Sequence, residues 1–144
     1  MPHLPTLKTL MTPFPYAVDI EASIAQAQDM MNEHAIRHLP VTDGGQLVGV
    51  LTDRDLHRYD PGLGTHRSQA NIRVRDIYVS DVYVVELTER LDVVLLQMAT
   101  RHIGSALVVR RDKLVGIFTA MDACQGFGDY LRTQLTSVPD PDAA

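Results

Sequence analysis

Cysteine is almost absent from this sequence of 144 residues, since Cys124 is the only one. A single cysteine can form neither an intramolecular disulfide nor a thiolate metal cluster, so we expect a protein of the reducing cytoplasm. No hydrophobic run approaches the roughly 18 residues that span a membrane, and the first residues lack the apolar segment of a secretory signal. The sequence therefore predicts a soluble protein without a membrane partner.

Positive charge is also in short supply, because 13 lysine and arginine residues face 18 aspartate and glutamate residues, for a net charge of −5. Non-specific binding of nucleic acid needs a basic face that displaces counterions from phosphates, so this function class is not expected. Hydrophobic residues make up 45% of the chain, which is enough for a sizeable core. The length fits one domain, or two small repeats that share a core.

The sequence contains an internal duplication at an offset of 67 residues. GVLTDRDL at 49–56 aligns with GIFTAMDA at 116–123, so that a glycine, a threonine and an aspartate each meet an identical residue. Further identical pairs upstream are Val18 and Val85, Met31 and Met98, Ile36 and Ile103, Val41 and Val108, Leu47 and Leu114, and Val48 and Val115. Such periodic self-similarity indicates two copies of one structural unit.

Each copy shows the same order of expected elements, β-α-β-β-α. The expected strands are 16–18, 38–42 and 47–51 in the first copy and 83–85, 105–109 and 114–118 in the second. Apolar residues spaced by three or four predict the first helix of each copy, with Ile24 and Ala27 in one and Leu91 and Val94 in the other. Asp19 and Thr88 are expected near the starts of these helices as caps. A second helix is expected to begin near Thr52 and near Thr119.

The turns between the paired strands differ in strength. Asp43-Gly44-Gly45 is a strong hairpin signal, whereas Arg110-Arg111-Asp112 is a weak one. We predict a first repeat at 8–60, a linker at 61–73, a second repeat at 74–135 and a flexible tail at 136–144. A unit of this size hardly buries a sheet face alone, so we expect an α/β (α+β) fold in which the repeats pack with pseudo-twofold symmetry.

The sequence resembles the CBS-domain family, whose tandem pair is called a Bateman module. The resemblance covers nearly the whole chain and depends on three segments: MTPFPYAVDIEASIAQA, RHLPVTDGGQLVGVLTDRDL and GSALVVRRDKLVGIFTAMDA. The family's most specific motif is a glycine, two apolar residues, a threonine or serine, two further residues and an aspartate, and it occurs twice here in register. No enzyme or transporter domain is expected beside it, so the resemblance implies a stand-alone pair.

The Thr-x-x-Asp part of this motif has two interpretations. A threonine at a helix start with an acid three residues later is nearly a capping box, which satisfies free backbone N–H groups. However, aspartate reaches back less far than the usual glutamate or glutamine, and a carboxylate that does not fold back is free to bind a ligand. Both interpretations stay open on the residues alone.

The resemblance implies that clefts between the repeats bind an adenosine compound: AMP, ADP, ATP or S-adenosylmethionine. Asp55 and Asp122 would each accept the two ribose hydroxyl groups of one ligand. Thr52 and Thr119, with the neighbouring helix amides, would suit a phosphate. The adenine would lie against the first strand of a repeat, which is formed by Ala17 and Val18 in one copy and by Val84 and Val85 in the other.

The two clefts are expected to be unequal. Arg37 and His38 stand where the family often places groups that contact phosphate, whereas their counterparts are Gly104 and Ser105. The second copy has its basic pair earlier in the sequence. The remaining expected binding residues are Thr12, Leu39, Pro40, Arg101, His102 and Ala106. We therefore expect the Asp55 cleft to be the better formed, although either basic pair could reach across to the other cleft.

The sequence thus predicts a non-catalytic regulatory module that binds an adenosine-containing nucleotide and signals to a separate protein. The nucleotide is a ligand, and neither a cofactor, a metal site nor a catalytic residue is expected. A homodimer formed through the helices is implied by the resemblance, with Leu91–Met98 and Met121–Leu135 as candidate surfaces. The alternative function is a structural dimerisation or interaction module whose clefts stay empty.

Overall fold

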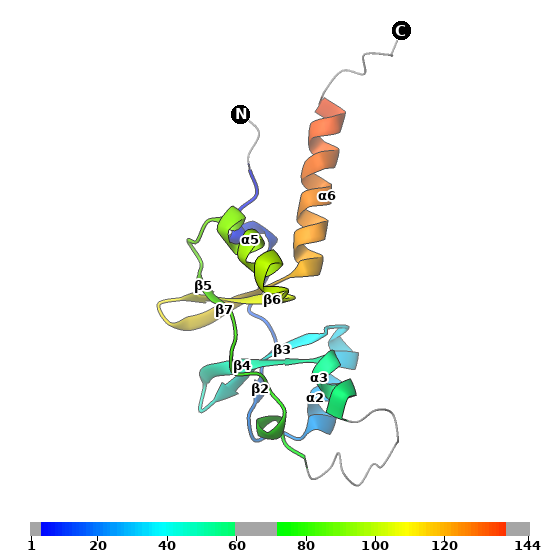
Figure 1. The fold of residues 1–144 in the computed structure, drawn as a ribbon, viewed down its shortest axis with the longest axis vertical. Helices are drawn as coiled ribbons and strands as arrows, with labels where there is room; N and C mark the ends of the chain where they lie inside the picture. The colour runs from blue at the N-terminus through cyan, green and yellow to red at the C-terminus, as the bar shows by residue number, and fades with distance from the viewer. Residues whose placement is uncertain (1–3, 60–71, 138–144) are drawn as a thin grey trace.

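The computed structural model describes residues 4–59 and 72–137 and contains two β-sheets that face each other, with helices on their outer sides (Figure 1). The first repeat consists of β2 (Val18–Asp19), α2 (Ile24–His34), β3 (His38–Asp43), β4 (Gln46–Thr52) and α3 (Asp53–Tyr59). The second consists of β5 (Val84–Glu86), α5 (Leu91–Arg101), β6 (Ser105–Arg110), β7 (Lys113–Thr119) and α6 (Ala120–Ser137). The predicted β-α-β-β-α order is confirmed in both copies.

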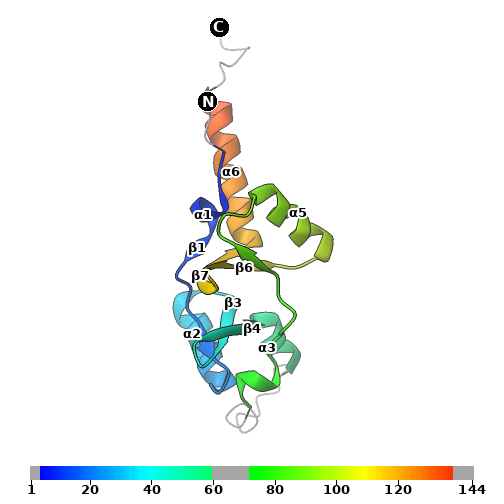
Figure 2. The ribbon, with the colours of Figure 1, turned by 90° about the vertical axis from the view of Figure 1, so that its left-hand side faces the viewer.

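Each repeat sends its first segment into the sheet of the other repeat. The N-terminal helix α1 (Leu7–Leu10) and strand β1 (Thr12–Pro13) lie with the second sheet, where β1 pairs antiparallel with β7 (Figure 2). The corresponding segment of the second repeat, the 3-10 helix η1 (Val74–Asp76) and the residues after it, returns to the first sheet. There Val79 and Val50 exchange two backbone hydrogen bonds of 2.9 and 3.0 Å. The two repeats are therefore held together by backbone pairing as well as by packing.

The glycine of each motif lies where the exchanged segment crosses. A Cβ atom on Gly49 would collide with the carbonyl oxygen of Val79 and the ring of Tyr78. A Cβ atom on Gly116 would collide with the side chain of Met11. The motif requires glycine at these positions because another backbone or side chain occupies the space of a Cβ atom.

Three apolar clusters stabilise this arrangement. The first repeat's core, which includes Leu39 and Leu51, is completed by Val74 from the exchanged segment. The second repeat's core is completed in the same way by Leu7, which is 1% exposed. A third cluster joins the two sheets and contains Val50, Leu107 and Ile117. Because each core takes a residue from the other repeat's leading segment, neither repeat buries its core alone.

The first helix of each repeat begins later than its expected cap. Ser23 caps α2 by accepting a hydrogen bond from the backbone N–H of Gln26, whereas the carboxylate of Asp19 accepts from Glu21. Arg90 precedes α5 without a side-chain cap, so Thr88 is not the cap either. The predicted helices are present, but the expected caps at Asp19 and Thr88 are wrong.

Both hairpins use the same turn despite their different sequences. Gly44 and Gly45 have φ angles of +58° and +85°, and Arg111 and Asp112 have +52° and +63°. Two consecutive positive φ values match the right-handed twist of the flanking strands. The second hairpin therefore adopts with two non-glycine residues a turn that the first forms with two glycines.

The predicted linker and tail lie largely beyond the described ranges. Of the linker at 61–73 only residues 72 and 73 are described, and of the tail only residues 136 and 137, which belong to α6. No helix within 4–59 and 72–137 combines the length and apolar character that a membrane span requires.

Candidate functional site at the boundary of the repeats

The two Thr-x-x-Asp motifs form identical structures at the starts of α3 and α6. The backbone N–H of Thr52 donates to Asp55 Oδ2 at 2.9 Å, and the N–H of Asp55 donates to Thr52 Oγ1 at 3.2 Å. Thr119 and Asp122 repeat both bonds at the same distances. Each pair is a reciprocal capping box that satisfies two free N–H groups.

This geometry corrects one part of the sequence interpretation. The shorter reach of aspartate does not prevent Asp55 and Asp122 from folding back, because both carboxylates accept the N–H of their own threonine. Capping is therefore a function of the motif in this conformation. A carboxylate has two oxygens with about four acceptor sites, so one capping bond leaves capacity for further donors.

His38 lies between the two caps. Its Cε1 atom is 3.3 Å from the position that a Cβ atom on Gly104 would occupy, so the imidazole of the first repeat lies against the backbone of the second. Its Nδ1 atom is buried and has no hydrogen-bond partner. Ser105, the counterpart of His38, is a smaller residue, and one imidazole thus occupies the space at the boundary.

The charges around His38 come from both repeats. Burial lowers the pKa of His38 below its ordinary value of 6.5, and Arg37 lowers the pKa further. Asp53 and Asp55 of α3 oppose that change, as does Asp122 of α6. The backbone places the second cap near this histidine as well, because Gly104, against which His38 lies, accepts the N–H of Ala120 at the start of α6 at 2.9 Å.

Most side chains of the expected cleft walls point into the cores, so these walls would present mainly backbone atoms to a ligand. Val18 and Val85 point into the cores of their repeats, and so do Leu39 and Ala106, both 0% exposed. Ala17 and Val84 are exposed and could offer side chains to a ligand. Ala17 and Val18 border a hollow of about 440 Å3 whose other lining residues come from β2 and the α2 region, not from Thr52 or Asp55.

Pro40 makes the first wall chemically different from the second. In the second repeat the N–H of Leu107 donates to the carbonyl oxygen of Tyr83 at 2.9 Å. Pro40 is the counterpart of Leu107 and has no N–H, so the carbonyl of Tyr16 receives no such bond. The difference lies on the backbone that the adenine is expected to contact.

Two aromatic pairs beside the walls were missed by the sequence analysis. The Tyr16 ring stacks on His34 with centroids 3.6 Å apart, and Arg101 lies over the Tyr83 ring at 5.0 Å from its centroid. The offset of 67 residues aligns Tyr16 with Tyr83 and His34 with Arg101. Burial, then Glu89, raises the pKa of Tyr83, whereas the cation of Arg101 opposes that change.

The remaining predicted residues are distributed unevenly. Arg37 is exposed beside His38, and its carbonyl accepts the N–H of Asp53 at 3.0 Å. Ser105 begins β6 opposite Thr119, just as His38 begins β3 opposite Thr52. Thr12, in β1, pairs with Ile117 of β7. His102 follows the last residue of α5 and has a left-handed backbone conformation. Within the described residues, no group of three or more His, Cys, Asp or Glu side chains is placed to hold a metal ion.

The profile of the CBS domain matches this chain twice, at residues 7–62 and 74–127. The protein therefore belongs to the CBS-domain family and contains a tandem pair of such domains. Its fold is that of solved CBS pairs: the structure of AcuB from Vibrio cholerae aligns with a TM-score of 0.80 at 25% identity, over 95% of this chain and 100% of that one.

Two further matches cover most of this chain. The CBS pair of protein MJ0100, solved with 5′-methylthioadenosine and S-adenosyl-L-methionine, aligns with a TM-score of 0.76 at 26% identity, over 88% of this chain and 98% of that one. L-aspartate semialdehyde sulfurtransferase of Methanocaldococcus jannaschii is 27% identical over 124 residues, which is 85% of this chain. That match spans only 23% of the sulfurtransferase, so the chain corresponds to about a quarter of that relative.

Proposed function

We propose that this CBS pair is a non-catalytic regulatory module that binds an adenosine-containing ligand between its repeats. The observation that carries the proposal is the position of His38, which lies opposite Thr52 of the first cap and against Gly104, whose carbonyl accepts the N–H of Ala120 beside the second cap. Carboxylates with spare acceptor sites suit the paired hydroxyl groups of a ribose. A CBS pair 26% identical to this one was solved with two adenosine compounds, which supports the same ligand class here.

The proposed ligands are AMP, ADP, ATP and S-adenosylmethionine-type compounds. Asp55 and Asp122 would accept the ribose hydroxyl groups, and the adenine would lie on the wall at Ala17 or Val84. Arg37 and His38 give the first cleft a group that can be cationic, which favours a ligand with phosphates there. Arg101 contacts Tyr83 on the wall of the second repeat. We therefore propose that the Asp55 cleft binds phosphorylated ligands better than the Asp122 cleft does.

Signalling would follow from differential affinity. A ligand that binds one arrangement of the two repeats more tightly shifts the population toward that arrangement. The backbone exchange between the sheets transmits such a change to both repeats, because each core contains a residue from the other's leading segment. We propose a homodimer and a separate regulated protein as the partners that read this change.

A structural dimerisation or interaction module with empty clefts is the second candidate function. The observation that favours it is the set of exposed apolar side chains on α5 and α6, such as Leu96 and Phe127. The capping boxes also satisfy the motif's polar groups without any ligand.

A thermal-shift panel separates the two candidates. AMP, ADP, ATP, 5′-methylthioadenosine, S-adenosylmethionine and NAD would be tested on the wild type, Asp55→Ala and Asp122→Ala. A ligand at 100 times its Kd adds about 2.7 kcal/mol of stability, which raises Tm visibly. The sensor predicts a rise with at least one adenosine compound that is lost in one aspartate variant. No rise with any compound would contradict it and leave the interaction module.

A further inference from the structure

The imidazole of His38 has a buried Nδ1 atom without a hydrogen-bond partner. The residue begins β3 opposite Thr52 of the first cap, and its ring lies against Gly104 of the second repeat. Its counterpart in the duplication is Ser105, which has no titratable group. A buried polar atom without a partner costs free energy that a ligand can recover. The boundary of the repeats therefore contains an unsatisfied, titratable group that neither cap uses.

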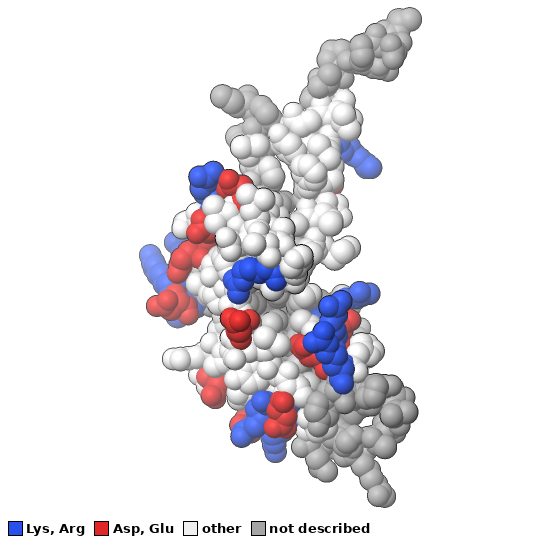
Figure 3. Space-filling view, viewed as in Figure 1, with Lys and Arg blue, Asp and Glu red and all other residues white. Residues whose placement is uncertain are grey.

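Charges of both signs act on this imidazole. Figure 3 shows basic and acidic side chains close together around α3, the helix that follows β4. Burial is the largest influence on His38 and lowers its pKa, so the neutral form is favoured at pH 7. Thr52 and Gly104, which lie against His38 from β4 and from the second repeat, carry no charge. The charged groups are Arg37, next to it in the sequence, which lowers the pKa, and Asp53 and Asp55 on α3 and Asp122 on α6, which raise it.

We infer that His38 takes up a proton when an adenosine ligand with phosphates binds, and that this step distinguishes phosphorylated from uncharged adenosine ligands. A neutral imidazole has one N–H donor, whereas the imidazolium has two donors and a positive charge. Phosphates in the proposed Asp55 cleft would bring negative charge to the ring and favour its charged form. 5′-Methylthioadenosine brings no such charge. The inference rests on the proposed function and adds a specificity-determining residue to it.

Linkage sets the sign of the pH dependence. His38 binds its proton more tightly in the phosphate complex than in the free protein, so the affinity for a phosphorylated ligand rises as the pH falls. One proton changes Kd by at most about tenfold per pH unit. Once the pH is below the pKa of the free imidazole, the ring is charged before the ligand arrives and this contribution ends. The affinity for 5′-methylthioadenosine has no such dependence on His38.

Titration calorimetry in two buffers of different ionisation enthalpy counts the protons exchanged on binding. ADP and 5′-methylthioadenosine are the two probes, each titrated into the full chain at pH 7. The wild type is expected to take up a net fraction of a proton, up to about one, with ADP and none with 5′-methylthioadenosine. Donors that contact ADP favour loss of a proton from its phosphate, so a net uptake comes from the protein.

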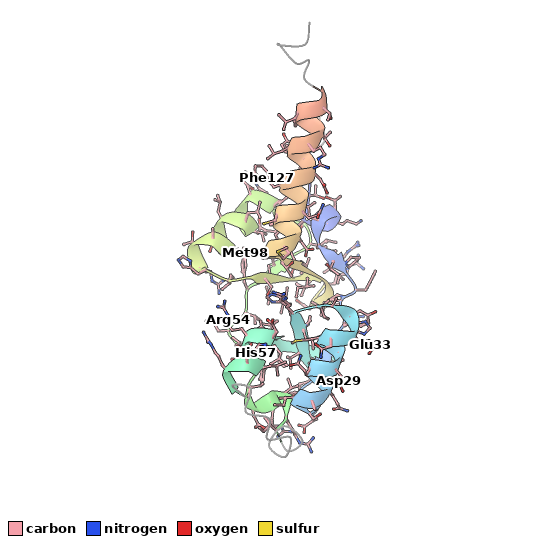
Figure 4. The ribbon with its side chains drawn as sticks, turned by 90° about the vertical axis from the view of Figure 1, so that its right-hand side faces the viewer. Asp29, Glu33, Arg54, His57, Met98 and Phe127 are labelled. Carbon is pink, nitrogen blue, oxygen red and sulfur yellow. The ribbon has the colours of Figure 1, made fainter. Side chains whose placement is uncertain are left out.

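Two histidine variants assign the proton to a residue. His38→Asn retains an amide that can donate to a ligand but does not titrate, so it is expected to take up no proton with ADP. Between pH 8 and 6 its Kd for ADP should change less than that of the wild type, by up to about tenfold per pH unit. His57 is exposed on α3, where Figure 4 shows it with Arg54. The control His57→Asn keeps His38 and is expected to behave like the wild type.

The outcomes separate this inference from the proposed function. No net uptake by the wild type with ADP would overturn the inference, and that result needs no variant. Equal uptake by the wild type and His38→Asn, or equal uptake with both ligands, would overturn it as well. Binding of 5′-methylthioadenosine without binding of ADP would also refute it but leave the proposed function standing. No binding of either compound would contradict the inference and the proposed function together.

Discussion

The two repeats have the same backbone structure but carry different side chains where they meet. Both caps have bonds of 2.9 and 3.2 Å, and both hairpins turn through two positive φ values. At the boundary, however, the first repeat places His38 where the second has Ser105, and Pro40 where the second has Leu107. The exposed helix positions differ as well, since Asp29 and Arg54 of the first repeat correspond to Leu96 and Met121 of the second. The duplication therefore preserved the residues that build the fold, while the surfaces that we propose for ligand binding changed.

The difference shows which positions the fold itself constrains. Gly49 and Gly116 are identical because each lies under an exchanged segment. Thr52 and Thr119, like their aspartates, are identical because each pair caps a helix. Residues without such a structural requirement are free to diverge, and we propose that His38 and Pro40, which differ from Ser105 and Leu107, make the two clefts unequal.

Substitution of the two motif glycines is expected to have the largest effect on stability. The effect should differ between Gly49 and Gly116, because different atoms of the exchanged segments lie against them. Gly49→Ala would lower the free energy of unfolding by about 3 kcal/mol, because its Cβ meets the carbonyl of Val79, which the bridge to Val50 holds in place. Gly116→Ala would cost about 1 kcal/mol, because the flexible side chain of Met11 can move aside and the carbonyl oxygen of Thr12, 3.1 Å from the added Cβ, has to shift only slightly. Urea denaturation followed by circular dichroism compares them. Equal losses of unfolding free energy, or a greater loss for Gly116→Ala, would contradict this prediction.

Replacing His38 by its counterpart is expected to remove a pH dependence. Because burial lowers the pKa of His38 in the folded state, the unfolded chain binds its proton more readily. The wild type therefore loses stability as the pH falls below about 6.5, until the lowered pKa is passed. His38→Ser is expected to lose less stability on acidification, because it lacks the buried imidazole. The control His57→Ser replaces an exposed histidine and retains His38, so it is expected to lose as much stability as the wild type. Denaturation midpoints between pH 5 and 8 measure this, and parallel curves for wild type and His38→Ser would refute it.

The hairpins should give the smallest effect, with opposite signs in the two repeats. Arg111→Gly would stabilise the protein by up to about 1 kcal/mol, since glycine adopts a φ of +52° without the cost that other residues incur. Gly44→Ala would destabilise it by a similar amount, since a Cβ there meets no other atom and only the φ of +58° is costly. Thermal melts of the two variants test this pair. A change of the same sign in both would show that the turns are not equivalent.

Much of this architecture could be predicted from the sequence, because a weak pattern in one repeat is supported by the aligned pattern in the other. The segment Arg110-Arg111-Asp112 has a weak turn signal, yet its alignment with the strong signal of Asp43-Gly44-Gly45 indicates a hairpin. The burial of Ile24, Ala27 and Met31 follows from their helical spacing. The family motif placed both Thr–Asp pairs at helix starts, and the structure confirms their position.

Other features depend on contacts that single-residue patterns do not encode. The exchange of leading segments pairs Val79 with Val50, and no local signal in either segment specifies that partner. The stacking of Tyr16 on His34 also depends on the meeting of a strand and a helix end. One signal was available for both: the offset of 67 residues aligns Leu7 with Val74 and Tyr16 with Tyr83. The sequence comparison already matched 16–18 with 83–85, and extending it to Leu7 would have marked Leu7 and Val74 as structural equivalents.

Isothermal titration calorimetry on isosteric variants tests the central claim, that a ribose-bearing ligand binds at the capping carboxylates and favours the first cleft. Asp55→Asn and Asp122→Asn retain an oxygen that can accept the capping N–H but lose the second acceptor oxygen. With the adenosine compound that gives the largest thermal shift, Asp55→Asn is predicted to raise Kd at least about tenfold and Asp122→Asn to change it less. Equal affinity in the wild type and both variants, or no binding heat with any adenosine compound, would contradict the account.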